Sequence, residues 1–371
     1  MEKFIYTSIV FFTAVILTLY VYLLFEKILE AIKNKIRDAN EDEVFKLIDE
    51  IVLKLEGENL KDEDVIKIKD IIKSRIKREL VEERLIYYFM IYSGDIIKRL
   101  TKLVEKVGLV DFEIQNLNSD NLYTVSLAAR RLGEFRSKKA IEPLLKALDI
   151  NSNDVKYNVL LALSKIGDED AFIKAFEKLE DKILLSERSL IEIIDDFEGD
   201  KVKVYKTMFN SKNSFLASIF MKSAANYMDV SLSDIVANFL RDPNKEKRIA
   251  AIKFIGNLSD ARYIDDIIER LQDEEWEVRA VAAKVLERFQ DERAVMPLVK
   301  ALSDKVWFVR YNAASSLIKI PKGIDAIDLV MQGNDRFAKD IILYAAQNIE
   351  LLEVTEDDRE KIKKVIERYK R

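Results

Sequence analysis

The 371-residue sequence contains no cysteine and no histidine. This excludes metal sites built on thiolates or imidazoles, cysteine or serine–histidine nucleophilic centres, and disulfide bonds. The nine glycines are scattered, and none belongs to a GxxxxGK[ST] or GxGxxG phosphate-binding motif. Carboxylates are plentiful, but carboxylates on exposed helix faces are usually solvated. We therefore expect no catalytic residue, no cofactor, no metal and no small-molecule substrate, and we predict that the protein is not an enzyme.

Proline is scarcer than glycine, with four residues in the whole chain. No linker rich in glycine, proline or serine divides the sequence, although 371 residues is long for a single core. Apolar residues recur at i, i+3, i+4 and i+7 among alanine, leucine, glutamate and lysine, a spacing typical of amphipathic helices. The sequence predicts an all-α protein, and a solenoid of stacked helices accommodates its length without a linker.

Two neighbouring stretches, residues 273–302 and 303–320, repeat one pattern. Placing Arg279 over Arg310 aligns Trp276 with Trp307, and the same offset of 31 residues leads back to Arg248. The matching apolar positions continue upstream to residue 125, with an adjustment of about one residue near position 217. Fixed periods of about 20 to 50 residues indicate arrays in which each unit buries its apolar face against its neighbours. We therefore predict an α-solenoid of about seven to eight helical hairpins.

The repeated VR-xx-AA-xx-L pattern, followed by a short turn and a second helix ending in leucine, resembles HEAT-like repeats of the phycobilisome-lyase type. The resemblance covers about residues 121–350 and is strongest in VRAVAAKVLERFQDERAVMPLVKAL and VRYNAASSLIKI, whereas residues 183–240 depart from it. It implies a solenoid that acts mainly as a protein-binding scaffold. Some members of the family act in bilin attachment, but the repeats identify no chemistry, and no catalytic residue is carried over.

The longest run without a charged side chain is FIYTSIVFFTAVILTLYVYLLF, residues 4–25. As a helix this run would be roughly 33 Å long, enough to cross a hydrocarbon core of about 30 Å. A cleaved signal peptide is the alternative, but the run is longer than the usual apolar region of a signal and lacks a small-residue cleavage site. A buried core helix is the third interpretation. We predict a retained single-pass membrane anchor.

Flanking charges predict the orientation of this anchor. Lys3 precedes the run, and four basic residues follow it: Lys27, Lys33, Lys35 and Arg37. Cytoplasmic flanks carry the excess of lysine and arginine, so residues 26–371 are predicted to lie in the cytoplasm.

Three regions are expected: the anchor at 1–25, a helical membrane-proximal adaptor or cap at 26–120, and the repeat solenoid at 121–371. In the adaptor, a helix is expected to begin with Asn40 as its cap, and LIYYFMIY at 85–92 is expected to be a buried helix. The basic residues of 61–80 suit either a solvated helix face, which we favour, or contact with anionic lipid.

Conspicuous residues of the repeats have structural and functional interpretations. Asp168, Asp260 and Asp291 precede second helices, where a carboxylate can accept from free backbone N–H groups. Arg248, Arg279 and Arg310 recur at one position, which favours a ladder of structural hydrogen bonds over a ligand site. The only two tryptophans, Trp276 and Trp307, start successive first helices with Phe308 and Tyr311 nearby. They are either packing residues, the interpretation that we favour, or a candidate protein interface.

The leading hypothesis is a membrane-anchored scaffold that binds another protein, of unknown identity, at the cytoplasmic surface. The alternative is an accessory protein or lyase-like enzyme acting on a cofactor bound to a partner. Nucleic-acid binding is disfavoured, because 61 basic and 66 acidic residues give a net charge of −5 where such a solenoid needs a basic excess.

Overall fold

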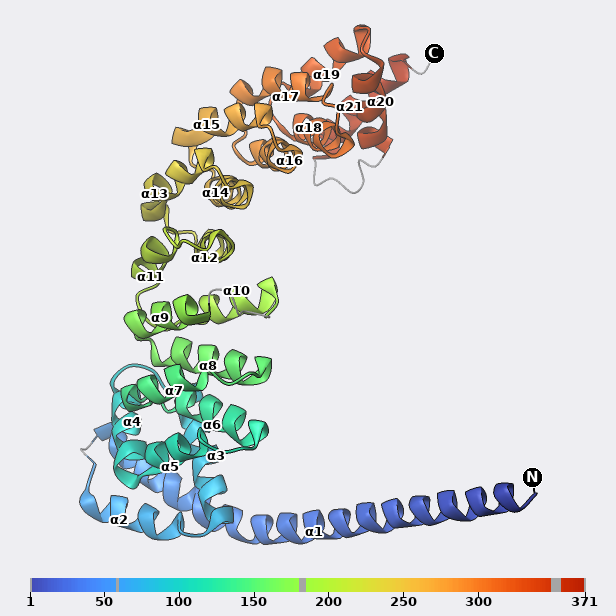
Figure 1. The fold of residues 1–371 in the computed structure, drawn as a ribbon. Coiled ribbons are helices and arrows are strands. Elements are labelled where there is room, and N and C mark those ends of the chain that lie inside the picture. Colours follow the sequence, from blue (N-terminus) through green and yellow to red (C-terminus); the bar gives the residue numbers. More distant parts are fainter. Residues whose placement is uncertain (1, 58–59, 180–184, 348–354, 370–371) are drawn as a thin grey trace. The chain divides into compact units, whose positions relative to one another are not determined.

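The computed structural model describes residues 2–57, 60–179, 185–347 and 355–369, and within these ranges every regular element is a helix. The chain forms two compact units, unit 1 (Met1–Ile166) and unit 2 (Gly167–Arg371), whose helices are labelled in Figure 1. The predicted all-α solenoid of helical hairpins is confirmed.

Unit 1 contains α1 (Glu2–Gly57), α2 (Asp62–Ile71), α3 (Arg75–Ile91), α4 (Asp95–Val107), α5 (Leu109–Asn116), α6 (Leu122–Glu134), η1 (Lys138–Ala140), α7 (Ile141–Ala147) and α8 (Asn153–Ile166). Unit 2 contains α9 (Glu169–Leu179), α10 (Glu187–Asp195), α11 (Lys201–Met208), α12 (Ser214–Tyr227), η2 (Val230–Leu232), α13 (Ser233–Ala237), η3 (Asn238–Arg241), α14 (Lys245–Leu258), η4 (Ala261–Tyr263), α15 (Ile264–Glu269), η5 (Arg270–Gln272), α16 (Trp276–Val285), η6 (Leu286–Arg288), η7 (Glu292–Ala294), α17 (Val295–Ala301), α18 (Trp307–Lys319), α19 (Gly323–Gln332), α20 (Arg336–Gln347) and α21 (Glu356–Tyr369).

The first helices of successive repeats in unit 2 pack directly on one another: α12 on α14, α14 on α16, α16 on α18, and α18 on α20. Small residues line these seams. Ala282 and Ala283 of α16 and the matching alanines of α18 are completely buried. On α14, a Cβ added to Gly256 would lie 2.0 Å from Cγ1 of Val285 on α16, so only glycine fits there. The repeated small residues thus fix how closely neighbouring repeats approach.

Helix α1 is one uninterrupted helix from Glu2 to Gly57. It crosses the expected boundary between anchor and adaptor at residues 25 and 26 without a break. The predicted helix start at Asn40 is wrong, because Asn40 lies inside α1 and its Nδ2 donates to the carbonyl oxygen of Ile36 at 2.6 Å. A side chain that caps a helix when the backbone is free can equally bond to its own preceding turn.

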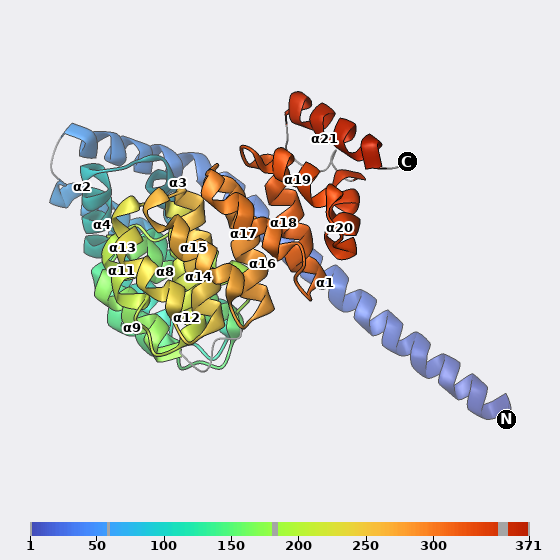
Figure 2. The same ribbon diagram turned by 90° about the horizontal axis from the view of Figure 1, so that it is seen from above.

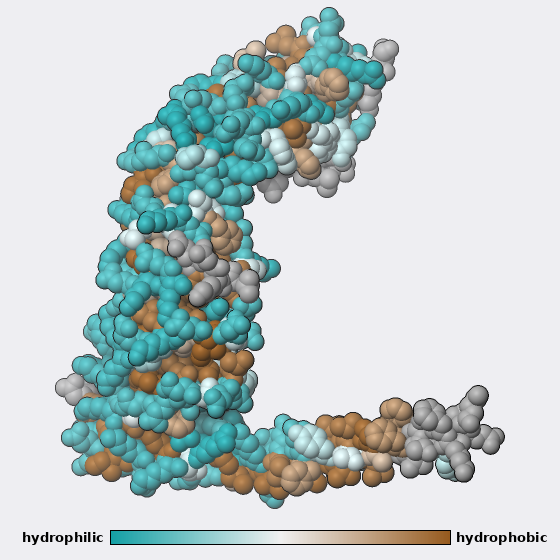
Figure 3. Space-filling model, in the orientation of Figure 1, coloured by the Kyte–Doolittle hydropathy of each residue, from teal (hydrophilic) through white to brown (hydrophobic). Residues whose placement is uncertain are grey.

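The two halves of α1 differ in their surroundings. Apolar residues at helical spacing in the second half are buried in unit 1, as their pattern predicts: Val44, Ile48, Ile51, Val52 and Leu55. The first half extends beyond the other helices of unit 1 in both views of Figures 1 and 2, and its described apolar side chains are exposed. Figure 3 shows this apolar surface in brown on the described part of the projecting helix.

The stretch of α1 from Phe11 onward is long and apolar enough to cross a membrane, and its most apolar window has no residue buried inside the structure. A signal sequence near the amino terminus would meet the same criterion. The second apolar stretch, residues 85–92, forms the last part of α3 and its C-cap, Tyr92. The prediction of a buried helix holds for one side only, since Leu85 and Phe89 are buried while Met90 is 73% exposed.

A buried ionic cluster lies where α3, α5 and α6 of unit 1 meet. Glu82 and Glu113 are 0% and 1% exposed, and Nη1 of Arg131 lies 2.7 Å from a carboxylate oxygen of each. Burial raises the pKa of Glu82 to about 8; the positive charge of Arg131 opposes this rise, the Glu113 carboxyl adds to it, and Arg78 opposes it weakly. One guanidinium therefore holds two carboxyl groups, of which one keeps its proton at neutral pH.

This raised pKa predicts how the stability of the protein depends on pH. Glu82 ionises near pH 4.5 in the unfolded chain but only near pH 8 in the folded protein. Its contribution to the free energy of unfolding is therefore complete below pH 4.5 and falls by about 1.4 kcal/mol per pH unit toward pH 8. Few other groups titrate in this window, because histidine and cysteine are absent. Glu82→Gln should flatten the slope measured by urea unfolding between about pH 5 and pH 8.

Glu63→Gln is the matched control, since Glu63 is an exposed carboxylate on the neighbouring helix α2. It should keep the slope of the unaltered protein. A Glu82→Gln protein with that same slope would contradict the assignment.

Candidate protein-binding site

A ladder of arginines connects the repeats of unit 2. Arg248, Arg279 and Arg310 lie on α14, α16 and α18, and Nη1 of each donates to a carbonyl oxygen six residues earlier at 2.8 Å. Two of them also reach the next repeat. Arg248 Nη2 lies 2.8 Å from Oδ1 of Asp273, and Arg279 binds Asp304 through Nε and Nη2 at 2.7 and 3.1 Å. These arginines are held by structural bonds inside the array.

Asp273 and Asp304, whose carboxylates bind these arginines, belong to a second series at 31-residue intervals: Asp242, Asp273, Asp304 and Asp335. Each accepts a backbone N–H at the start of the following first helix, at 2.8 to 3.1 Å. Burial would raise the pKa of Asp304, but hydrogen bonds from Arg279 and from the Val306 N–H hold it below its usual value. The sequence analysis missed this series, although the repeat period contains the signal.

The three aspartates that were predicted as caps lie at the expected turns. Oδ1 of Asp168 accepts from the Ala171 N–H at 3.1 Å, and Oδ1 of Asp260 and Asp291 accepts from an N–H two residues later at 3.2 and 2.9 Å. These aspartates, like the arginines, form hydrogen bonds within the array. The aromatic residues are therefore the candidates for contact with another molecule.

The tryptophans belong to a cluster that spans three first helices. Trp276 begins α16 and stacks on Phe308 of α18 with ring centroids 5.8 Å apart. Trp307 contacts Phe308 and Tyr311 at 5.2 and 5.1 Å, and Tyr344 of α20 closes the cluster at 5.5 Å from Trp307. Phe308 is therefore the ring that joins the two tryptophans. We call these five residues the aromatic ledge.

The aromatic ledge is only partly covered by the protein. Trp276 and Trp307 are each 39% exposed, Tyr344 is 45% exposed, and Phe308 is 56% exposed. Tyr344 was not among the predicted interface residues, because it does not occupy the repeat position of the tryptophans. Rings stacked on one another while facing solvent form a rigid apolar surface, which is the kind that anchors protein interfaces.

A groove of about 420 Å³ crosses the first helices of the same unit, from α10 to α18. Cationic side chains recur along it at the repeat period: Lys222, Lys253 and Lys284. We call these three residues the basic row. A second row at the same period comprises Asn226, Asn257 and Arg288, and Arg288 donates to Oδ1 of Asn257.

Ion pairs occupy only part of the basic row. Lys222 binds Glu187 at 2.9 Å and Lys284 lies 3.1 Å from Glu287, whereas Lys253 is exposed and forms no ion pair with any residue in the described ranges. The groove therefore carries an excess of positive charge. Its wall also includes apolar side chains: Ile191, Ala225, Val281 and Val285.

The groove and the aromatic ledge adjoin on α18. Asn312 lines the groove and lies one helical turn after Phe308, so the two side chains share a face of the helix. The combined surface offers aromatic rings, amides and ammonium groups to one ligand. In the part of the chain that the structure describes, no group of acidic residues is arranged to hold a metal ion.

Comparisons with known proteins identify the repeats. Residues 110–184, 232–318 and 264–348 match HEAT repeats. No curated protein matches the sequence. Among solved structures, an engineered protein is 18% identical over 83% of this chain and 99% of its own, with a TM-score of 0.37. The complex of CpcE and CpcF of phycocyanin lyase from Nostoc sp. PCC7120 is 17% identical over 70% of this chain and 94% of its own, with a TM-score of 0.30.

The arginine ladder leads to a prediction about stability. Arg279→Met should lower the free energy of unfolding by about 3 to 5 kcal/mol, because it leaves the half-buried Asp304 and two backbone carbonyls without their partner. Arg279→Lys should fall in between, since an ammonium cannot make the paired bonds of a guanidinium. Urea unfolding of the full chain measures both losses.

Arg293→Met provides the control, because Arg293 also binds two aspartates but does so on the exposed surface. It should unfold close to the unaltered protein. Equal losses for Arg279→Met and Arg293→Met would contradict the structural role of the ladder.

Proposed function

Because the chain belongs to the HEAT-repeat family, whose matches cover just over half of it, we propose that it is a scaffold that binds another protein and holds it at a membrane. The binding surface is the aromatic ledge together with the adjoining groove in unit 2. The anchor is the first half of α1. HEAT arrays bury their apolar residues between repeats, so apolar groups left facing solvent are available for a partner.

The exposed aromatic ledge is the observation that carries this proposal. A residue that serves only to join two helices is expected to be buried between them, yet Phe308, which joins the two tryptophans, is 56% exposed. Tryptophan and tyrosine are over-represented among the residues that dominate binding energy at protein interfaces. The rings are also held by one another before a partner arrives, which lowers the entropic cost of binding.

The basic row adds a requirement on the partner. Lys253 has no ion pair among the described residues, and the ammonium groups lie beside amides and apolar side chains. A segment that places an apolar residue on the ledge and carboxylates along the groove would satisfy both surfaces. Nucleic acid fits less well, because a backbone of phosphates needs a continuous cationic track, and here Glu187 and Glu287 lie beside the lysines.

The membrane location rests on α1. The segment of α1 up to Phe25 carries no charged side chain after Lys3, and its described apolar side chains are exposed. The basic residues that follow it favour a cytoplasmic location of the remaining chain. We favour the scaffold over the alternative of a lyase-like accessory protein, because the most exposed part of the surface consists of stacked apolar rings.

The experiment replaces both tryptophans with alanine in the full-length chain. Proteins that co-purify with the unaltered chain from detergent-solubilised membranes are quantified for each variant. Trp276→Ala combined with Trp307→Ala should reduce recovery of the partner at least about tenfold, as for residues that dominate an interface. The melting temperature of this variant should fall only modestly. Replacing a fully buried aromatic residue with alanine lowers the free energy of unfolding by about 3 to 5 kcal/mol, and the partly exposed tryptophans should cost less.

Met296→Ala is the matched control, because Met296 is a large apolar residue of α17 that is 67% exposed. It should leave recovery unchanged. A marked loss of melting temperature in the tryptophan variant, with unchanged recovery of every partner, would show that the tryptophans only join helices.

A further inference from the structure

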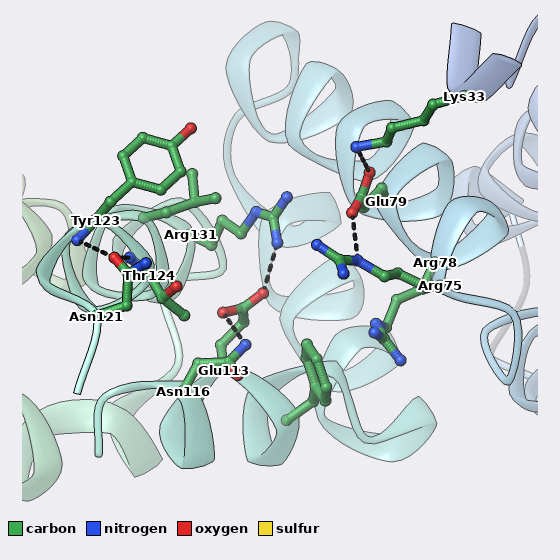
Figure 4. A pocket seen from close by; sticks show the side chains of 12 residues that line it. Lys33, Arg75, Arg78, Glu79, Glu113, Asn116, Asn121, Tyr123, Thr124 and Arg131 are labelled. Atoms are coloured by element: carbon green, nitrogen blue, oxygen red, sulfur yellow. Dashed lines mark hydrogen bonds and ion pairs between the residues drawn. The ribbon is translucent and has the colours of Figure 1, made fainter. Parts of the chain in front are cut away.

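Unit 1 contains a cavity of about 720 Å³ between α1, α3, α5 and α6, shown from close by in Figure 4. We propose that this cavity binds a phosphate group, and that the headgroup of an anionic phospholipid supplies it. The second part rests on the membrane anchor of the proposed function. The site is separate from the surface of unit 2 described above.

Positive charge exceeds negative charge around the cavity. Four cationic side chains reach it from three helices, Lys33 of α1, Arg75 and Arg78 of α3, and Arg131 of α6, against two carboxylates, Glu79 and Glu113. Ordinary ionisation leaves two positive charges without a counter-charge among these six groups. The buried Glu82 behind Arg131 adds little negative charge at neutral pH, because it keeps its proton there.

The two carboxylates are already engaged with the protein. Glu79 binds both Lys33, at 3.1 Å, and Arg75, at 3.2 Å, as the dashed lines of Figure 4 show. Glu113 lies 2.7 Å from Nη1 of Arg131. These pairs hold the cations at the cavity wall, so a ligand meets side chains that are already in place.

Among the four cations of the cavity, Arg78 is the one that forms no ion pair with a described residue. Its guanidinium lies over the ring of Phe112, 3.8 Å from the ring centroid, and donates to the carbonyl oxygen of Ile72 at 3.4 Å. These contacts fix the plane of the guanidinium and leave N–H groups for an anion. A guanidinium binds phosphate oxygens through two parallel hydrogen bonds, which suits it to this ligand better than an ammonium.

The ion pairs between α1 and α3 place the cavity relative to the apolar segment. Lys33 lines the cavity and pairs with Glu79 of α3, and Arg37 pairs with Glu83, so this part of α3 lies beside the part of α1 that follows the apolar segment. Lys33 is eight residues beyond Phe25, the end of the charge-free run, which is about 12 Å along the helix.

Long basic side chains at this distance can reach the headgroup region of a bilayer. The polar layer on each side of the hydrocarbon core is about 5 to 8 Å thick, and arginine side chains can extend toward it. Apolar side chains of α1 continue to the level of the cavity, since Ile28, Leu29 and Ile32 are about half exposed. A lipid whose tails lie against the anchor can therefore bring its phosphate to the cavity.

Only part of the basic run at 61–80 takes part in this site. Lys73 pairs with Asp70 and Lys77 with Glu43, whereas Arg75 and Arg78 line the cavity. The proposed lipid contact is therefore made by two arginines in one pocket, and not by the whole basic helix lying on the membrane surface.

The test uses the full-length chain in micelles of a neutral detergent. Phosphatidylglycerol and phosphatidylcholine are titrated separately, and lipid binding is followed by the rise in the melting temperature. Phosphatidylglycerol should stabilise the unaltered chain and phosphatidylcholine should not. Arg78→Gln should weaken phosphatidylglycerol binding about tenfold or more, with little change in the melting temperature without lipid.

Two further variants keep the test decisive. Arg75→Gln, at an exposed side chain of the cavity rim, should also weaken binding and replaces Arg78→Gln if that variant melts early without lipid. Lys98→Gln removes an exposed cation of α4 that is remote from the cavity lining and should leave binding unchanged. If all three variants bind phosphatidylglycerol as tightly as the unaltered chain does, the cavity is not the binding site.

Soluble anions separate the two sources of phosphate. Inorganic phosphate and glycerol 3-phosphate should stabilise the chain only at much higher concentrations than the lipid. If either binds as tightly as phosphatidylglycerol, the lipid source is wrong. The assay requires no partner protein and no cell, so its failure is distinguishable from failure of the proposed scaffold function.

Discussion

The bond between an arginine of one repeat and an aspartate of the next is the interaction on which the arrangement of unit 2 depends. Arg248 and Arg279 each hold a carbonyl of their own repeat and the carboxylate that begins the following first helix. Because guanidinium bonds are directional, they fix the offset between neighbouring helices, while alanine and glycine at the seams fix their separation. With the helices in this arrangement, Phe308 stacks on Trp276, and Lys222, Lys253 and Lys284 of three successive first helices line one groove.

Much of this arrangement could be predicted from the sequence, because burial between stacked units leaves a strict period in the residues that are buried. The repeat period, the helical class and the apolar face of Val44 to Leu55 all follow from that rule. The continuity of α1 through Asn40 did not follow. Local sequence allows Asn40 either to begin a helix or to bond to its own preceding turn, and only the surrounding structure decides between them.

The candidate sites could not be predicted from the 31-residue repeat alone, because they depend on contacts between residues at different repeat positions. Tyr344 joins the aromatic ledge from a different repeat position, and the basic row consists of lysines, which are common on any helix surface. A net charge of −5 likewise conceals two places where cations gather, the groove of unit 2 and the cavity of unit 1. Both become visible only in the folded chain, because the fold decides which charged side chains lie on one face.

The central claim is that a membrane-anchored chain presents the aromatic ledge to a partner in the cytoplasm. The most direct measurement uses single cysteines in a chain that has none of its own, with a membrane-impermeant maleimide as the label. Lys305→Cys lies at an exposed position two residues before Trp307 and keeps every ring of the ledge, and Met296→Cys lies on α17. We predict no labelling of either in intact cells. After permeabilisation, position 305 should react more slowly than position 296, and the two should react alike in the purified chain. Labelling in intact cells, or equal rates after permeabilisation, would contradict the account.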